Sequence, residues 1–115
     1  MSTFQQEMER IKRGTGQLSQ AVPETMKAFY ALSKSASAPG ALDTKTKELM
    51  ALAIGVVLRC DGCIGFHTRA ALQAGATAQE IMETLSVAVM MGGGPALMYA
   101  THALDALAEL QNPSA

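Results

Sequence analysis

The segment from Leu49 to Leu58 constrains the fold more than any other part of this sequence. Its residues are nearly all apolar, so a helix built from them has almost no polar face. Such a helix is expected to be buried on nearly all sides, yet a chain of 115 residues has little material with which to cover it. The segment therefore predicts a helical bundle that associates with further copies of itself.

The remainder of the sequence also favours helices. Alanine, leucine, methionine, glutamine, glutamate and lysine are abundant, and segments with the alternating pattern of a β-strand are absent. We therefore predict an all-α fold in which residues 1–115 form one domain of about six helices. The expected helices cover residues 3 to 13 with an end near Gly14 and Gly16, 23 to 36, 43 or 44 to the end of the apolar segment, the turn at 60–63 to 74, 78 to 91, and 95 to about 111.

Several helix ends are marked by residues with special backbone or capping properties. Pro23 suits a first helical turn, where its missing N–H would be unpaired in any case. Gly75 can adopt the left-handed conformation that often ends a helix. The sequence from Thr77 to Glu80 forms a capping box, and Gly92 to Pro95 interrupts the helical pattern that follows it. In the fourth helix, Thr68 is expected on the wetter side.

The overall charge excludes two classes of partner. Nine basic and ten acidic residues give a net charge of -1, so the chain has no positive surplus for binding nucleic acid or anionic lipid. The polar N-terminus, Met1 to Arg13, lacks the apolar core of a signal peptide, and the apolar run at 49–58 is far shorter than a membrane span of about 20 residues. We expect a cytoplasmic protein with neither nucleic acid nor membrane as a partner.

Self-association is also favoured by the composition. Only 17% of the residues are charged, against roughly 25% in an average soluble domain. The surface that a monomer would present to water is therefore poor in charge, and we expect a homo-oligomer.

The two cysteines, Cys60 and Cys63, are the main candidates for chemistry. In a reducing compartment a CxxC pair is more often redox-active or metal-bound than a structural crosslink. Cys63 is expected near the start of a helix, where free backbone N–H groups and the helix dipole stabilise a thiolate. The spacing also allows the two sulfurs to form a disulfide, so that one can attack a substrate and the other resolve the product.

His67 is the candidate proton carrier beside this pair. It lies four residues after Cys63, on the same helical face and about 6 Å further along the axis. It could therefore move a proton to or from the thiol. His102 has no such neighbour in the sequence, and we interpret it as a surface or interface residue. Glu48, taken alone, is an ordinary first-turn glutamate favoured by the helix dipole.

Two other interpretations of the cysteines compete with redox chemistry. Zinc could be held by Cys60, Cys63 and His67, with His102 or Glu48 as a fourth ligand, but neither a second CxxC nor a paired histidine motif completes the usual site. The protein would then be a non-enzymatic, zinc-binding helical oligomer. Alternatively, the cysteines could be two small buried apolar residues.

Taken together, Glu48, Cys60, Cys63 and His67 form the pattern E-x11-C-x2-C-x3-H. This pattern resembles the signature of the alkylhydroperoxidase D-like group within the carboxymuconolactone decarboxylase superfamily. The resemblance covers roughly residues 41–110. It implies an all-α fold of the alkylhydroperoxidase D type, assembled as dimers that commonly build a trimer of dimers.

The resemblance also implies an activity and roles for these residues. The CxxC would reduce peroxides in antioxidant defence and be re-reduced by an external dithiol, a lipoyl group on a partner protein in the best-known branch, with no tightly bound cofactor. Cys63 would attack the peroxide, Cys60 would resolve, and Glu48 and His67 would relay protons. A lactone decarboxylase is the alternative that the superfamily name suggests, although typical decarboxylases lack this cysteine pair.

Three features of the sequence depart from that picture. The better-studied peroxidase has a histidine where this chain has Gly62, and better-studied members carry the fold twice in one chain. Glu48 precedes Cys60 by twelve residues, about 18 Å along a straight helix, whereas His67 is about 6 Å past Cys63. A plain antiparallel hairpin would not bring the glutamate and the histidine together, so the relay requires strong helix crossing, a bent connection, or a glutamate from a neighbouring subunit.

Overall fold

The computed structural model describes residues 3–112, and within that range its regular elements are all helices, joined by short turns and loops. The all-α prediction is confirmed. The helices are α1 (Thr3–Ala21), α2 (Pro23–Ser37), α3 (Thr44–Val57), α4 (Asp61–Gln73) and α5 (Ala78–Gln111). The helix α5 consists of two helical halves that meet at a kink at Gly93, whose φ of 69° and ψ of -150° are not helical. The predicted break at residues 92–95 is therefore present inside a single long helix, and this accounts for five helices instead of six.

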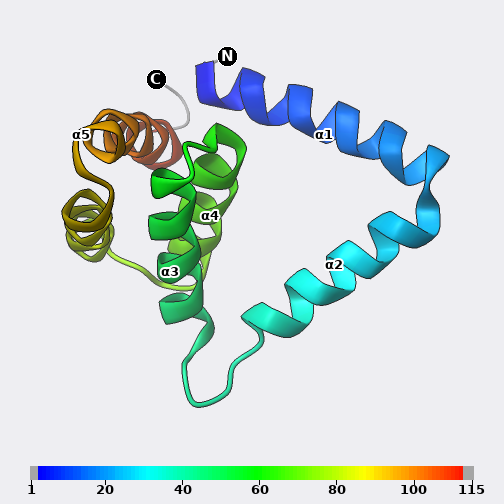
Figure 1. Cartoon of the computed structure of the whole chain (residues 1–115), viewed down its shortest axis with the longest axis horizontal. Helices are drawn as coiled ribbons and strands as arrows, with labels where there is room; N and C mark the ends of the chain where they lie inside the picture. Colours follow the sequence, from blue (N-terminus) through cyan, green and yellow to red (C-terminus); the bar gives the residue numbers. More distant parts are fainter. Residues whose placement is uncertain (1–2, 113–115) are drawn as a thin grey trace.

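The core lies where the α3–α4 hairpin packs against both halves of α5 (Figure 1). Large side chains from all three helices are fully buried there, among them Leu52, Ile64 and Ile81. The far half of α5 contributes a row of small residues instead, Ala96, Ala100 and Ala103, which lets the neighbouring helices approach closely. This packing holds the α3–α4 turn and the start of α4, which carry the two cysteines, against the core.

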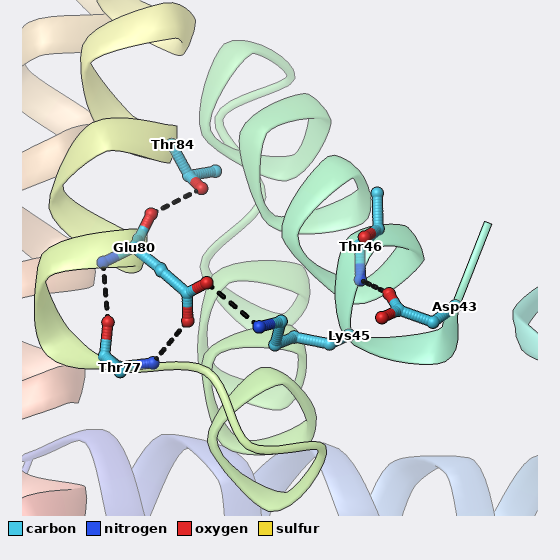
Figure 2. Close-up of polar contacts among 6 residues, drawn as sticks. All are labelled: Asp43, Lys45, Thr46, Thr77, Glu80 and Thr84. Atoms are coloured by element: carbon cyan, nitrogen blue, oxygen red, sulfur yellow. Dashed lines mark hydrogen bonds and ion pairs between the residues drawn. The ribbon is translucent and has the colours of Figure 1, made fainter.

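Hydrogen-bonded caps fix the beginnings of α3 and α5 and connect the two helices (Figure 2). The Asp43 carboxylate accepts from the backbone N–H of Thr46 at 2.8 Å. The predicted capping box is formed: the Thr77 hydroxyl accepts from the backbone N–H of Glu80, and the Glu80 carboxylate accepts from that of Thr77. Glu80 also forms an ion pair with Lys45 at 2.9 Å, which ties the start of α5 to the first turn of α3.

The start of α1 packs against α4 and α5, and α1 then runs away from the core to a corner, from which α2 returns toward the beginning of α3 (Figure 1). Every residue of α2 is at least partly exposed, including the large apolar side chains Phe29, Tyr30 and Leu32. The predicted end of the first helix near Gly14 was wrong, because α1 continues to Ala21. Each glycine costs a helix only about 1 kcal/mol. Helix α1 ends only at Ala21, and Pro23 is the first residue of α2.

Burial within the single chain differs from expectation at Thr68, and it covers α3 on one side only. One side of α3 is buried at Leu52 and Val56, but Ile54 on its other side is 56% exposed. That exposed side borders a groove of about 360 Å³ whose lining is almost entirely apolar, and which includes Val87 and Met91 of α5. Conversely, Thr68 is fully buried, with its hydroxyl lacking a hydrogen-bond partner among the described residues. The helical pattern correctly indicated apolar faces, but not which of them a single chain covers.

The helix α5 is long and apolar enough to cross a membrane when judged by length and composition alone. The core helices of soluble proteins meet the same criterion. In this fold α5 is kinked at Gly93 and contributes buried side chains on both sides of the kink, from Ile81 to Leu107.

Candidate functional site

A three-residue turn joins α3 to α4 and places the cysteines. Leu58 caps α3, Arg59 adopts a left-handed backbone conformation with φ of 59°, and Cys60 is extended. The turn is held by a hydrogen bond from the backbone N–H of Cys60 to the carbonyl of Gly55, at 3.0 Å. The chain therefore reverses direction immediately before the CxxC segment.

Cys60 and Cys63 occupy the cap and the first turn of α4, as the sequence indicated. Cys60 is the N-cap residue, and its sulfur accepts a hydrogen bond from the backbone N–H of Cys63 at 3.2 Å. The two residues form a disulfide, with their Cα atoms 5.2 Å apart, and both are half-buried. The pair can thus exist in the oxidised state without any change in the fold around it.

Gly55 allows α3 to approach the cysteines closely. A Cβ atom at this position would lie 2.9 Å from Cys63 Cβ, closer than real side chains pack. Any larger residue would push α4 away from α3 at the reactive pair. The apolar pattern of α3 did not reveal this requirement, because a glycine within an otherwise apolar helix has no distinguishing sequence signal.

Glu48 and His67 are brought together within one chain, so the expectation that a plain hairpin could not do this was wrong and no glutamate from a neighbouring subunit is required. The Oε2 atom of Glu48 lies 2.7 Å from Nδ1 of His67. The error arose from counting the turn as helix. Measured from the helix ends, Glu48 is about 14 Å before Val57 and His67 about 9 Å after Asp61, and two side chains span the remaining offset of about 5 Å.

The environment of this pair fixes the orientation of the histidine. The Glu48 side chain is 11% exposed and that of His67 is 34% exposed. A buried carboxylate is costly unless it is paired, and a carboxylate can only accept hydrogen bonds. Nδ1 of His67 therefore donates to Glu48, which leaves Nε2 as the nitrogen that exchanges protons.

A second histidine–carboxylate pair adjoins the CxxC segment. Nδ1 of His102, on α5, lies 2.6 Å from Oδ1 of Asp61, the residue directly after Cys60. The ring of Tyr99 packs against His102 with its centroid 4.7 Å away. The interpretation of His102 as a surface residue was incomplete, since its side chain is only 38% exposed and bonded to α4. The 41 residues between the partners hide this pair from any analysis of local spacing.

Helix α1 covers the face of α4 that carries Gly62. A Cβ atom at Gly62 would lie 2.9 Å from Cδ1 of Ile11, and one at Gly65 would lie 3.2 Å from the sulfur of Met8. A histidine at position 62, as in the better-studied peroxidase, would have to displace Ile11. Glycine at position 62 therefore allows α1 to pack closely on the face of α4 next to the cysteines.

A cavity of about 500 Å³ opens between α1, the start of α4 and the end of α5. Its lining includes Asp61 and His102, together with Arg10, Arg13 and Asp105. It gives small polar molecules a path to the second histidine–carboxylate pair. Among residues 3–112, the His, Cys, Asp and Glu side chains form no group of three or more with the geometry of a metal site.

Comparison with known proteins identifies relatives over nearly the whole chain. Residues 23–106 match the carboxymuconolactone decarboxylase family. An uncharacterized protein of Cupriavidus necator is 43% identical over 97 residues, which are 84% of this chain and 86% of that protein. An uncharacterized protein of Paracoccus denitrificans, encoded in its cox locus, is 41% identical over 90% of this chain and 93% of its own length.

Two solved structures share the fold. A carboxymuconolactone decarboxylase family protein of Legionella pneumophila superposes with a TM-score of 0.92 and is 44% identical, covering 96% of this chain and 98% of its own. A family member of Thermotoga maritima, a candidate for involvement in the antioxidative response, superposes with a TM-score of 0.82 at 35% identity and covers 92% of this chain and 91% of its own.

Proposed function

The chain belongs to the carboxymuconolactone decarboxylase family, and on this basis we propose that it is a CxxC-dependent thiol oxidoreductase that reduces peroxides with electrons from an external dithiol. The observation that carries the proposal is a disulfide-forming CxxC at the start of α4, with His67 one helical turn after Cys63. Glu48 of α3 is hydrogen-bonded to that histidine. The relation to the Thermotoga maritima protein supports a role in antioxidant defence.

In the peroxide step, the Cys63 thiolate attacks one peroxide oxygen. The O–O bond breaks, the sulfur becomes a sulfenic acid, and the departing alkoxide takes a proton to become an alcohol. His67 is placed to hold that proton on Nε2, with Glu48 stabilising the positive ring. The Cys60 thiolate then attacks the sulfenic sulfur, so that hydroxide leaves as water and the disulfide forms.

The reductive step restores both thiols. A dithiol, such as a lipoyl group on a partner protein, attacks the disulfide and is oxidised to a cyclic disulfide as its two protons pass to the cysteines or to solvent. Such a donor and a reducible disulfide belong in a reducing compartment, so we place the protein in the cytoplasm. No resident cofactor is needed for this cycle.

Serine variants of the two cysteines test the proposal and separate their roles. In dithiol-dependent peroxide turnover, Cys63→Ser should lose activity by at least about 100-fold, since the attacking thiolate is removed. Cys60→Ser should lose steady turnover but still reduce about one equivalent of peroxide, leaving a sulfenic acid that a dimedone probe captures on Cys63.

Other outcomes would support the competing functions. Undiminished peroxide turnover in both serine variants would overturn the proposal. Lactone decarboxylation that survives both substitutions would instead favour the decarboxylase. One zinc per chain that protects both thiols from alkylation, measured on freshly purified protein, would favour the metal-binding oligomer.

We also propose that the protein assembles as a homo-oligomer, a dimer or a trimer of dimers. The support is the apolar groove beside α3, bordered by Ile54 and Val57, together with the exposed apolar side chains of α2. Ile54→Glu should lower the mass measured by sedimentation to that of a smaller assembly, whereas Leu18→Glu on α1 serves as the control. A wild-type protein that sediments as a 12.0 kDa monomer contradicts this assembly.

A further inference from the structure

The pair formed by Asp61 and His102 has no role in the cycle described above. We infer that His102 is a positioning residue that sets the charge at the start of α4: when protonated it neutralises Asp61 and so favours the thiolate of Cys60. The inference rests on the proposed thiol chemistry, but it concerns the cysteine pair itself and not the peroxide.

Asp61 lies at the positive end of the α4 dipole, beside Cys60. Asp61 is the first residue of α4, and the N-cap Cys60 directly precedes it. The positive end of the helix dipole stabilises a negative charge at either residue. A carboxylate and a thiolate placed side by side at that end repel each other, so an unopposed Asp61 disfavours the Cys60 thiolate.

His102 determines whether Asp61 is opposed. Its Nδ1 atom is 2.6 Å from the carboxylate, and its ring packs against Tyr99 on the preceding turn of α5. A protonated ring would cancel most of the carboxylate's charge as seen by the sulfur. A neutral ring would keep the hydrogen bond but leave the negative charge in place.

Other charged groups surround the pair and enter the same balance. From α1, Glu7, Arg10 and Arg13 line the cavity, with Glu7 and Arg10 bonded to each other at 2.7 Å. From α5, Asp105 adds a negative charge to the same lining. From α3, Glu48 is already bonded to His67, the histidine one turn after Cys63. Asp61 and His102 are therefore the histidine–carboxylate pair next to Cys60, whereas Glu48 and His67 lie on the Cys63 side.

The step affected is the opening and closing of the disulfide. When a donor thiolate attacks one sulfur, the S–S bond breaks and the other sulfur departs with the electron pair as a thiolate. The donor's second thiol then releases the first cysteine in the same way. A positive His102 stabilises the Cys60 thiolate in these exchanges, and the two protons finally come from the donor's thiols.

Alkylation of the reduced protein by iodoacetamide, a neutral reagent, measures the thiolate directly. The experiment uses full-length chains in which Cys63→Ser leaves Cys60 as the only thiol. At pH 6.5, adding Asp61→Asn should speed alkylation of Cys60 by about threefold to tenfold, because it removes the negative member of the pair and leaves the start of α4 more positive. Adding His102→Asn should slow alkylation by a similar factor, because asparagine can donate to Asp61 but carries no charge.

Opposite signs distinguish this role from a structural one. If the contact only held α4 against α5, both substitutions would change the rate in the same direction, and His102→Asn, which keeps the donor, would change it least. In the combined Asp61→Asn, His102→Asn chain the histidine substitution should have no further effect. Same-direction changes, or rates within a factor of 1.5 of the parent for both single substitutions, overturn the inference.

The matching chain with Cys60→Ser provides the control, because Cys63 should respond more weakly to the same substitutions. A response at Cys63 equal to that at Cys60 overturns the assignment to the Cys60 end. No peroxide is present in this measurement. A wild-type protein that fails to reduce peroxide would therefore defeat the proposed function while leaving the opposite-sign result, and the inference, intact.

Discussion

The two histidine–carboxylate pairs beside the cysteines have nearly the same geometry but very different surroundings. Glu48 and His67 are 2.7 Å apart, and Asp61 and His102 are 2.6 Å apart. The Glu48 side chain is 11% exposed, whereas that of Asp61 is 44% exposed. Distance alone would rank the pairs as equal. Burial makes the first one a part of the core and leaves the second open to solvent and to whatever enters the cavity beside it.

This difference predicts unequal costs when the histidines are removed. His67→Ala leaves a buried carboxylate without its partner and should destabilise the fold by about 3 kcal/mol. His102→Ala leaves a carboxylate that water can solvate and should cost less than about 1 kcal/mol. Urea unfolding followed by circular dichroism measures both. Equal losses would show that burial does not distinguish the two pairs.

Activity should separate the same two variants. His67→Ala also removes the proton carrier of the proposed peroxide step, so turnover should fall by about 100-fold. Both variants are assayed well below their unfolding midpoints, where each is folded. A difference in turnover then does not arise from the difference in stability. Turnover that falls further in His102→Ala than in His67→Ala would exchange the roles assigned to the two histidines.

The close approach of α3 to α4 sustains the buried pair, and Gly55 permits it. Gly55→Ala places a methyl group 2.9 Å from Cys63 Cβ and should destabilise the protein by about 1 to 3 kcal/mol through overpacking. Gly14→Ala is the matched control, because nothing lies within 4 Å of its Cβ position in α1. That control should stabilise the helix by about 0.5 to 1 kcal/mol. Thermal unfolding of the two variants gives the opposite signs, and a stabilised Gly55→Ala would show that the helices can separate freely.

Thr68, the neighbour of His67, shows a buried polar group without a partner. Its hydroxyl is fully buried and lacks a hydrogen bond among the described residues, whereas Glu48 has its histidine. Thr68→Val keeps the shape and removes the unsatisfied hydroxyl, so it should raise the free energy of unfolding by about 1 kcal/mol. Thr84→Val is the control, since its hydroxyl donates to the Glu80 carbonyl at 2.8 Å. A destabilised Thr68→Val would mean that the hydroxyl has a partner in solution.

The sequence predicted what depends on local pattern. The capping box at Thr77 and Glu80, the cap position of Cys60 and the break near Gly93 follow from short-range rules, and the structure contains all three. The contact between Asp61 and His102 depends on how α4 packs against the end of α5, and no local rule encodes a separation of 41 residues.

The meeting of Glu48 with His67 was misjudged for a related reason. It depends on where α3 ends and on the left-handed turn at Arg59, which shortens the path between the two helices. The outer face of α3 was correctly predicted to be apolar, but periodicity does not show whether the same chain or another copy covers it. Ile54 on this face is exposed in the single chain.

The ion pair between Lys45 and Glu80 gives the smallest effect and tests how an exposed pair responds to pH. The pKa of Glu80 is lowered from its ordinary value, first by the hydrogen bond from the Thr77 backbone and then by Lys45. A carboxylate with a lowered pKa stabilises the fold above its unfolded pKa, and this contribution disappears as the pH falls through the folded value. The urea midpoint of the wild type should therefore drop below pH 4.5 more steeply than that of Glu80→Gln. Glu83→Gln, one turn further along α5, is the matched control for removal of a carboxylate, because Glu83 accepts from Gln79 and is not the partner of Lys45. An unchanged slope in Glu80→Gln would mean that neither the Thr77 hydrogen bond nor the Lys45 ion pair lowers the pKa of this exposed carboxylate in solution.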